Sequence, residues 1–157
     1  MKKGLLLLGV IFLIVSGYYA YAGISAALNP PQPVDPAALT KRSDAASVTA
    51  DITFRNPIDK AGKEELIFEV AFNTHSVPLE NYDIANSVIL KNDQGKEVAT
   101  GFAWEPSSEA SHHRTGILKI KNDGLLTGDT SSLTMILKDL AGVPTREFKW
   151  EGDTLKY

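Results

Sequence analysis

Hydrophobic and polar residues alternate with a period of two along most of the chain from residue 47 onward. In the clearest run, Val48, Ala50, Ile52 and Phe54 alternate with polar residues. This alternation is typical of a β-strand with one buried face. Similar runs occur at residues 66–73, 88–90, 98–102, 118–120, 133–137 and 148–150. The pattern therefore predicts about seven strands.

Clusters of turn-forming residues separate these runs, and no helical period of any length occurs among them. The turn formers include Asn56-Pro57, Asn92-Asp93-Gln94-Gly95, Asn122-Asp123-Gly124 and Gly142-Val143-Pro144. Seven short strands over about 100 residues predict an all-β fold, specifically an immunoglobulin-like β-sandwich. We place this domain at residues 47–157.

A long apolar run precedes the predicted strands and begins just after Lys2 and Lys3. Residues 1–28 are therefore a signal peptide or a signal anchor. Cleavage would follow Ala20-Tyr21-Ala22, whereas an uncleaved run over residues 4–28 is long enough for one membrane-spanning helix. We favour the anchor, because the tyrosines near residue 20 suit a membrane interface and encumber a cleavage site. Either way, the domain is expected outside the cytoplasm, since Lys2 and Lys3 would stay inside.

A proline-rich segment at residues 29–46 is expected to form an extended stalk between the apolar run and the domain. The 157-residue chain has no cysteine, which excludes disulfides and thiolate metal sites. Without Lys2 and Lys3, the chain has 14 of its 16 basic residues and all 19 acidic residues, which gives a net charge of −5. This acidic balance gives no electrostatic reason to expect nucleic acid as a partner.

Two segments carry all three histidines: His75 follows the predicted strand 66–73, and His112 and His113 open the strand that includes residues 118–120. In a constant-type immunoglobulin arrangement these two strands are antiparallel neighbours. The histidine segments, nearly forty residues apart in the sequence, are therefore expected to meet at one end of the sandwich.

Imidazoles with a nearby carboxylate form the ligand set of zinc or copper(II). The sequence therefore offers a candidate metal site of His75, His112, His113 and Asp83. Strand parity places His112 on the core face with Leu118, and His113 on the outer face. On this basis His112 is the expected partner of His75. Both histidines could be ligands only if the strand begins as late as Arg114 or if a bulge re-aims one of them.

An ordinary structural role competes with the metal site. Histidines at strand ends commonly bond a backbone carbonyl or a carboxylate, and Arg114 could pair with an acid such as Asp83. Catalysis has no support in the sequence: Ser111 beside His112 is not a triad, and a G-x-S-x-G elbow and a phosphate-binding glycine loop are both missing.

Several motifs resemble those of an uncharacterised family of exported or membrane-anchored β-domains. In that family the histidine pair usually follows glycines, whereas residues 108–111 of this chain contain none. The resemblance implies a β-domain outside the membrane and transfers no activity. It rests on the segment Phe68 to Leu79, Tyr82-Asp83, Trp104, His112-His113-Arg114-x-Gly116-x-Leu118 and Gly142-Val143-Pro144-x-Arg146-x-Phe148-x-Trp150.

The sequence thus predicts a membrane-anchored extracytoplasmic module without catalytic activity. It would bind or assemble with a protein partner through an exposed sheet face or the loops at the histidine end. The alternative is an extracytoplasmic copper- or zinc-binding protein that uses the histidine cluster.

Overall fold

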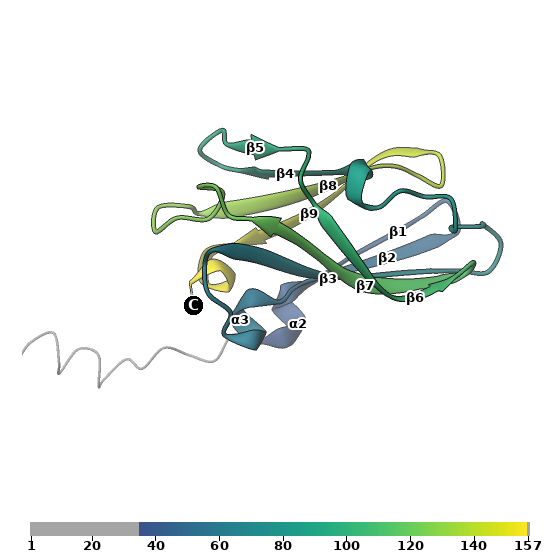
Figure 1. The fold of residues 1–157 in the computed structure, drawn as a ribbon, viewed down its shortest axis with the longest axis horizontal. Helices are drawn as coiled ribbons and strands as arrows, with labels where there is room; N and C mark the ends of the chain where they lie inside the picture. The colour runs from purple at the N-terminus through teal and green to yellow at the C-terminus, as the bar shows by residue number, and fades with distance from the viewer. Residues whose placement is uncertain (1–34, 157) are drawn as a thin grey trace, which may run out of the picture. The chain divides into compact units, whose positions relative to one another are not determined.

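A computed structural model describes residues 35–156 as two packed antiparallel sheets (Figure 1). The five-stranded sheet has the order β1-β2-β3-β7-β6, and the four-stranded sheet has the order β5-β4-β8-β9. The strands are β1 (Thr40–Ala45), β2 (Val48–Phe54), β3 (Glu65–Thr74), β4 (Val88–Asn92), β5 (Glu97–Val98), β6 (Ala103–Ala110), β7 (His113–Lys121), β8 (Ser132–Leu140) and β9 (Val143–Glu151). The predicted all-β, two-sheet architecture is confirmed.

Helical segments in the described part of the chain are short. They are α2 (Pro36–Leu39), α3 (Asn56–Asp59), η1 (Ala85–Ser87) and η2 (Gly152–Leu155). Within residues 35–156, none of them is long and apolar enough to cross a bilayer. The predicted anchor or signal peptide at residues 1–28 lies outside the described residues.

Two of the nine described strands were not predicted, and a third is shorter than expected. β1 lies in the segment assigned to the stalk, so the boundary at residue 47 is wrong: the fold already includes α2 and β1. β1 has no hydrophobic alternation because it is an edge strand with a polar sequence. It is held instead by pairing with β2 along its whole length and by a two-bond contact from Arg42 to Asp51.

β6 lies where the sequence indicated a loop, because it too is an edge strand without apolar alternation. It contains Pro106, and its register with β7 shifts between Pro106 and Ser108. Proline, exposed charge and a bulge are all common on edge strands, where they discourage pairing with other chains. The predicted strand at residues 98–102 is reduced to β5, which ends at Val98.

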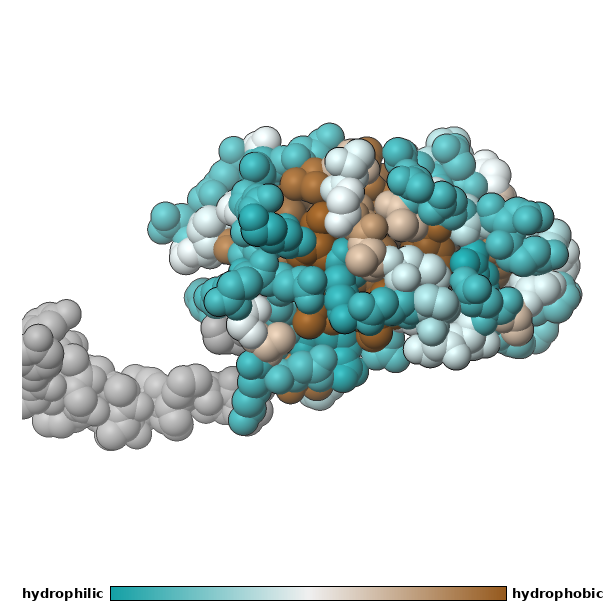
Figure 2. Space-filling view, viewed as in Figure 1, coloured by the Kyte–Doolittle hydropathy of each residue, from teal (hydrophilic) through white to brown (hydrophobic). Residues whose placement is uncertain are grey.

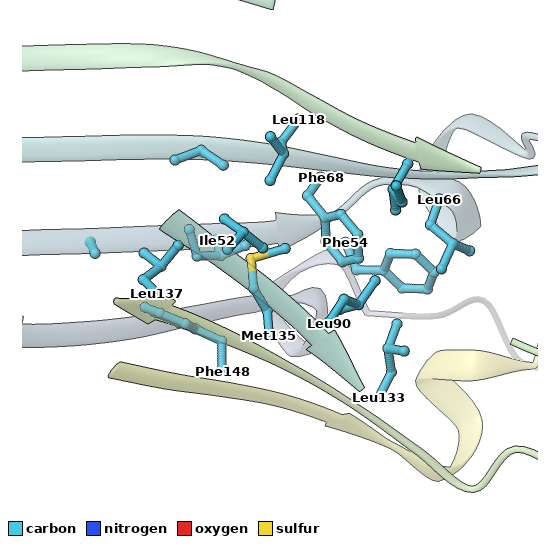
Figure 3. Packing of buried hydrophobic residues seen from close by; sticks show 14 of the residues in the cluster. Ile52, Phe54, Leu66, Phe68, Leu90, Leu118, Leu133, Met135, Leu137 and Phe148 are labelled. Atoms are coloured by element: carbon cyan, nitrogen blue, oxygen red, sulfur yellow. The ribbon is translucent and has the colours of Figure 1, made fainter. Parts of the chain in front are cut away.

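The core lies between the two sheets and is filled by the alternating residues that the pattern identified (Figure 3). Phe54 and Phe68 have ring centroids 5.2 Å apart, and Trp150 packs 5.3 Å from Phe68. The Trp150 indole also donates a buried hydrogen bond of 2.7 Å to the Leu39 carbonyl. Trp150 therefore joins the four-stranded sheet to the segment that leads into β1.

The two open sides of the sandwich differ. On one side β9 lies against β1, and its Arg146 side chain bonds the backbone of β1. On the other side, between β5 and β6, the half-buried residues Val98, Phe102 and Trp104 pack at the margin of the core. Figure 2 shows hydrophobic side chains between two hydrophilic borders on the face that includes this side.

Candidate functional site

The pairing of β3 with β7 brings the two histidine segments together, as predicted. The two strands pair antiparallel from Glu65 opposite Lys121 to Asn73 opposite His113. The rings of His75 and His113 then lie with centroids 6.4 Å apart and planes nearly perpendicular, at 83°. Both residues are exposed. The end of β3 and the start of β7 thus form a surface pair of imidazoles.

The expectation that His112 would be the partner of His75 is wrong. β7 begins at His113, so His112 lies in the turn before the strand, where its carbonyl accepts a bond from the Thr74 amide. Asn73 and His75 are two residues apart and share the outer face with His113, which pairs with Asn73. Strand parity placed His113 on the outer face, but the sequence did not indicate that His75 would meet it there.

The predicted metal site of His75, His112, His113 and Asp83 does not form as a cluster. Within residues 35–156, no group of three or more His, Cys, Asp or Glu side chains is placed to hold a metal ion. Asp83 instead accepts bonds from the amide and side chain of Asn86, which lower the pKa of its carboxyl. The local turn has therefore engaged the carboxylate that was expected to join the histidines.

Two buried arginines fix the loops at the same end of the sandwich. We call this end, which lies at the right in Figure 1, the histidine end; it comprises residues 46–47, 75–83, 111–112 and 141–142. Arg114, on β7, donates to the carbonyls of Leu79 at 2.8 Å and Tyr82 at 2.6 Å, and to Glu109 at 3.1 Å. It therefore holds the long connection between β3 and β4 against the β6–β7 hairpin.

Arg146, on β9, is 3% exposed, and within residues 35–156 its hydrogen bonds all go to backbone carbonyls. Its donors reach the carbonyls of Val48 and Ala45, each at 2.8 Å, and those of Leu140 and Ser43 at 3.3 and 3.4 Å. Burial lowers the pKa of the Arg146 guanidinium, because it disfavours the charged form. One side chain thus ties the β1–β2 turn to the β8–β9 turn.

The backbone is strained at this end. Of the five non-glycine residues with positive φ in the described part of the chain, four lie in or next to these two turns: Ala46, Ser47, Asp139 and Ala141. Left-handed backbone is unfavourable for such residues and persists where surrounding contacts hold it. The bonds of Arg146, and the bond of 2.8 Å from Thr74 Oγ1 to the Ser47 carbonyl, supply such contacts. A depression of about 370 Å³ borders the first turn, lined by residues 44, 45 and 47–49.

Tyr82 connects the surroundings of the two arginines. Its carbonyl accepts from Arg114, its hydroxyl donates to the Lys138 carbonyl at 2.8 Å, and its ring packs edge-on against Phe72. Burial raises the pKa of the Tyr82 hydroxyl to about 12. The tyrosine therefore anchors the loop 75–83 from both its backbone and its ring.

Arg146 and Tyr82 were named from the sequence only among the residues that carry the family resemblance, and no role was predicted for them, although a signal for Arg146 was present. Arg146, Phe148 and Trp150 occupy alternate positions and so share the core face of one strand. Arg114 likewise alternates with Gly116 and Leu118. A charged residue in the core-facing register of an alternating strand needs buried partners, and here these partners are loop carbonyls.

Comparison with protein-family models, with curated proteins and with solved structures gives no match to this chain. The family resemblance noted in the sequence stays a prediction, and the geometry of the histidine end is the basis for the functional proposals.

Proposed function

We propose that this chain is a binding and assembly module without catalytic chemistry, which recognises a protein partner through the histidine end. The observation that carries the proposal is the fixation of these loops by two buried arginines. Loops on a rigid sandwich are the usual position of recognition surfaces. Strained backbone held by its surroundings is characteristic of preorganised sites. A preorganised surface loses less conformational entropy when a partner binds.

We infer in addition that the sandwich is immunoglobulin-like. The order β2-β3-β7-β6 corresponds to strands A-B-E-D of that fold, and β4-β8-β9 corresponds to C-F-G. β5 adds to the second sheet beside the C position. In this arrangement the histidine end includes the connection from strand B to strand C and the hairpin between strands F and G.

Position-specific photo-crosslinking in the native cell tests the proposed surface. A photoreactive residue is placed at His112 or Ser76, and in matched controls at Gln94 or Asp129; all four are exposed, and the controls lie at the opposite end. We expect a discrete protein adduct from the first pair only. The same adduct from both pairs, or none from His112 and Ser76, would contradict the proposal.

We further propose that residues 1–28 anchor the module in the membrane, with the sandwich outside the cytoplasm. The basic start followed by a long apolar run supports this orientation. Because the chain has no cysteine, Gln94→Cys provides a unique thiol. A membrane-impermeant maleimide should label this thiol in intact cells, and the labelled chain should remain with the membranes. Labelling only after permeabilisation would contradict the orientation, and release at a start near Gly23 would indicate cleavage.

A second candidate function is the capture of copper or zinc at the histidine end. It is favoured by one observation, the 6.4 Å approach of the His75 and His113 rings. Imidazole is a ligand suited to both ions. The two candidates are compatible, since the ring pair lies within the same surface.

A further inference from the structure

The environment of His113 fixes which of its nitrogens is available to a ligand. Its Nδ1 lies 2.9 Å from the Asn73 side-chain oxygen, which can only accept a hydrogen bond. In the neutral ring, Nδ1 therefore carries the proton and Nε2 keeps a free lone pair. Histidines that bind metals characteristically donate their second N–H to an oxygen acceptor, which sets the ring orientation. Asn73 occupies that position for His113.

The separation of the two rings matches the distance needed to share one ion. A bond of about 2.0–2.1 Å from imidazole nitrogen to metal places the ring centroid about 3.2 Å from the ion. Two rings on one ion then have centroids about 4.5 to 6.4 Å apart, depending on the angle between the bonds. The observed distance of 6.4 Å lies at the upper end of this range. At that end the two bonds to the ion are nearly collinear, as for trans ligands of a square-planar copper(II) ion.

We propose that His75 and His113 form a two-imidazole surface site for a divalent transition-metal ion, with Asn73 as the positioning residue for His113. The site deepens the second candidate function and rests on it. Copper(II) is the preferred ion, because it leads the affinity order of the divalent first-row metals for nitrogen ligands. Two protein ligands leave the remaining positions of the ion to water or to a donor from a partner.

Titration of the untagged full-length chain with copper(II) tests the site. Calorimetry should give one binding event that His75→Ala and His113→Ala each weaken by at least about tenfold. Electron paramagnetic resonance should show nitrogen coupling from two imidazoles in the parent chain, and loss of one imidazole in each variant.

His112→Ala is the matched control, because His112 is exposed, adjacent in sequence to His113 and outside the ring pair. It should leave the affinity and the resonance spectrum unchanged. Equal losses in all three variants, or unchanged binding in His75→Ala and His113→Ala, would overturn the proposal. The unfolding midpoint of each variant shows that a loss is not due to unfolding.

The role of Asn73 has a separate readout. Asn73→Ala should weaken copper binding by about tenfold and broaden the nitrogen coupling, since His113 loses its orienting acceptor. Asn73→Asp should restore both, because a carboxylate also accepts from Nδ1. Unchanged coupling in Asn73→Ala, or no rescue by Asn73→Asp, would overturn this role. Failure of the metal site would leave the crosslinking pattern at His112 and Ser76 unaffected, so the two proposals are distinguishable.

Discussion

Arg114 and Arg146 are two buried arginines at one end of the molecule, and they are stabilised differently. They are 5% and 3% exposed, and in both the buried Nε atom has no hydrogen-bond partner among residues 35–156. Arg114 has an acid as one of its three acceptors, Glu109, whose side chain is 55% exposed. Arg146 has four carbonyl acceptors, and within residues 35–156 it forms no ion pair. The charge of Arg114 is thus partly balanced by an exposed carboxylate, whereas within residues 35–156 Arg146 is held by backbone carbonyls alone.

The difference shows that a buried guanidinium can act as a connector between loops instead of as half of an ion pair. Arg146 acts on both of its turns through the main chain, so the loop residues can vary without losing the contact. Arg114 depends partly on the identity of one side chain. The consequences of removing each arginine should therefore differ in size and in location.

The largest effect is expected from Arg146→Met, which keeps the volume of the side chain and removes its donors. The carbonyls of Ser43, Ala45, Val48 and Leu140 would lose this donor in the interior or at its margin. We predict a loss of about 4 kcal/mol in the free energy of unfolding, measured by urea titration with tryptophan fluorescence. Amide exchange should increase in both turns. A loss below about 1 kcal/mol would contradict the connector role.

Arg114→Met should have a smaller effect, of about 3 kcal/mol, by the same measurement. It removes two carbonyl contacts and leaves the half-exposed Glu109 carboxylate in contact with water. Increased amide exchange should be confined to residues 75–83 and the β6–β7 hairpin. Increased exchange in the β8–β9 turn would show that the two arginines act as one network.

The pH dependence of stability should report on Tyr82, which touches the surroundings of both arginines. Its pKa of about 12 in the folded chain exceeds its ordinary value of 10.0. The folded state therefore holds the phenolic proton more tightly. The resulting stability is complete below about pH 10 and is lost as the pH rises towards 12. We predict a loss of about 2 kcal/mol over this window, measured by urea titration at each pH.

Tyr82→Phe is the control for that measurement, because it keeps the ring packed against Phe72 and removes the titrating group. It should abolish the extra loss above about pH 10. It should also lower stability at neutral pH by about 1 kcal/mol, since the Lys138 carbonyl loses its donor. An unchanged alkaline profile in this variant would assign the titration to another group.

The smallest effect should come from Glu109→Gln, which removes the charge opposite Arg114 and keeps a side-chain oxygen as acceptor. We predict a change of about 0.5 kcal/mol, because a half-exposed carboxylate is well screened by water. Raising the salt concentration should reduce the difference further. A loss as large as that of Arg114→Met would mean that the carboxylate, not the loop carbonyls, stabilises Arg114.

Most of the sandwich could be predicted because its central strands expose one face and bury the other. β2 and β3 alternate in burial along their whole length, whereas β8 is buried at five consecutive positions, 133–137. The pairing of β3 with β7 followed from the inferred topology. β1 and β6 could not be found this way, because edge strands are stabilised largely by backbone pairing and need not contribute a regular apolar face. Their polar sequences resemble those of loops.

The candidate site was predicted only in outline. Topology correctly placed His75 near the histidine pair, but the choice between His112 and His113 depended on the residue at which β7 begins. Because β7 starts at His113, His112 lies in the turn before the strand, and no sequence pattern defines that start. Asp83 could not be excluded from the sequence either, because its bonds to Asn86 arise from a local turn.

The hydrogen bond from Trp150 to the Leu39 carbonyl has a mechanical consequence. β1 is the first strand that the described chain enters, and its pair of Thr40 with Thr53 lies at the open end of the β1–β2 hairpin. A pulling force transmitted through residue 35 would open this ladder one pair at a time, starting next to Leu39. The Trp150 indole bond to the Leu39 carbonyl lies where that force enters the fold, so this bond must break before the ladder opens. Its rupture would expose the first pair of this ladder to the load, while the bonds from Arg146 to the Ser43 and Ala45 carbonyls still hold the far end of β1.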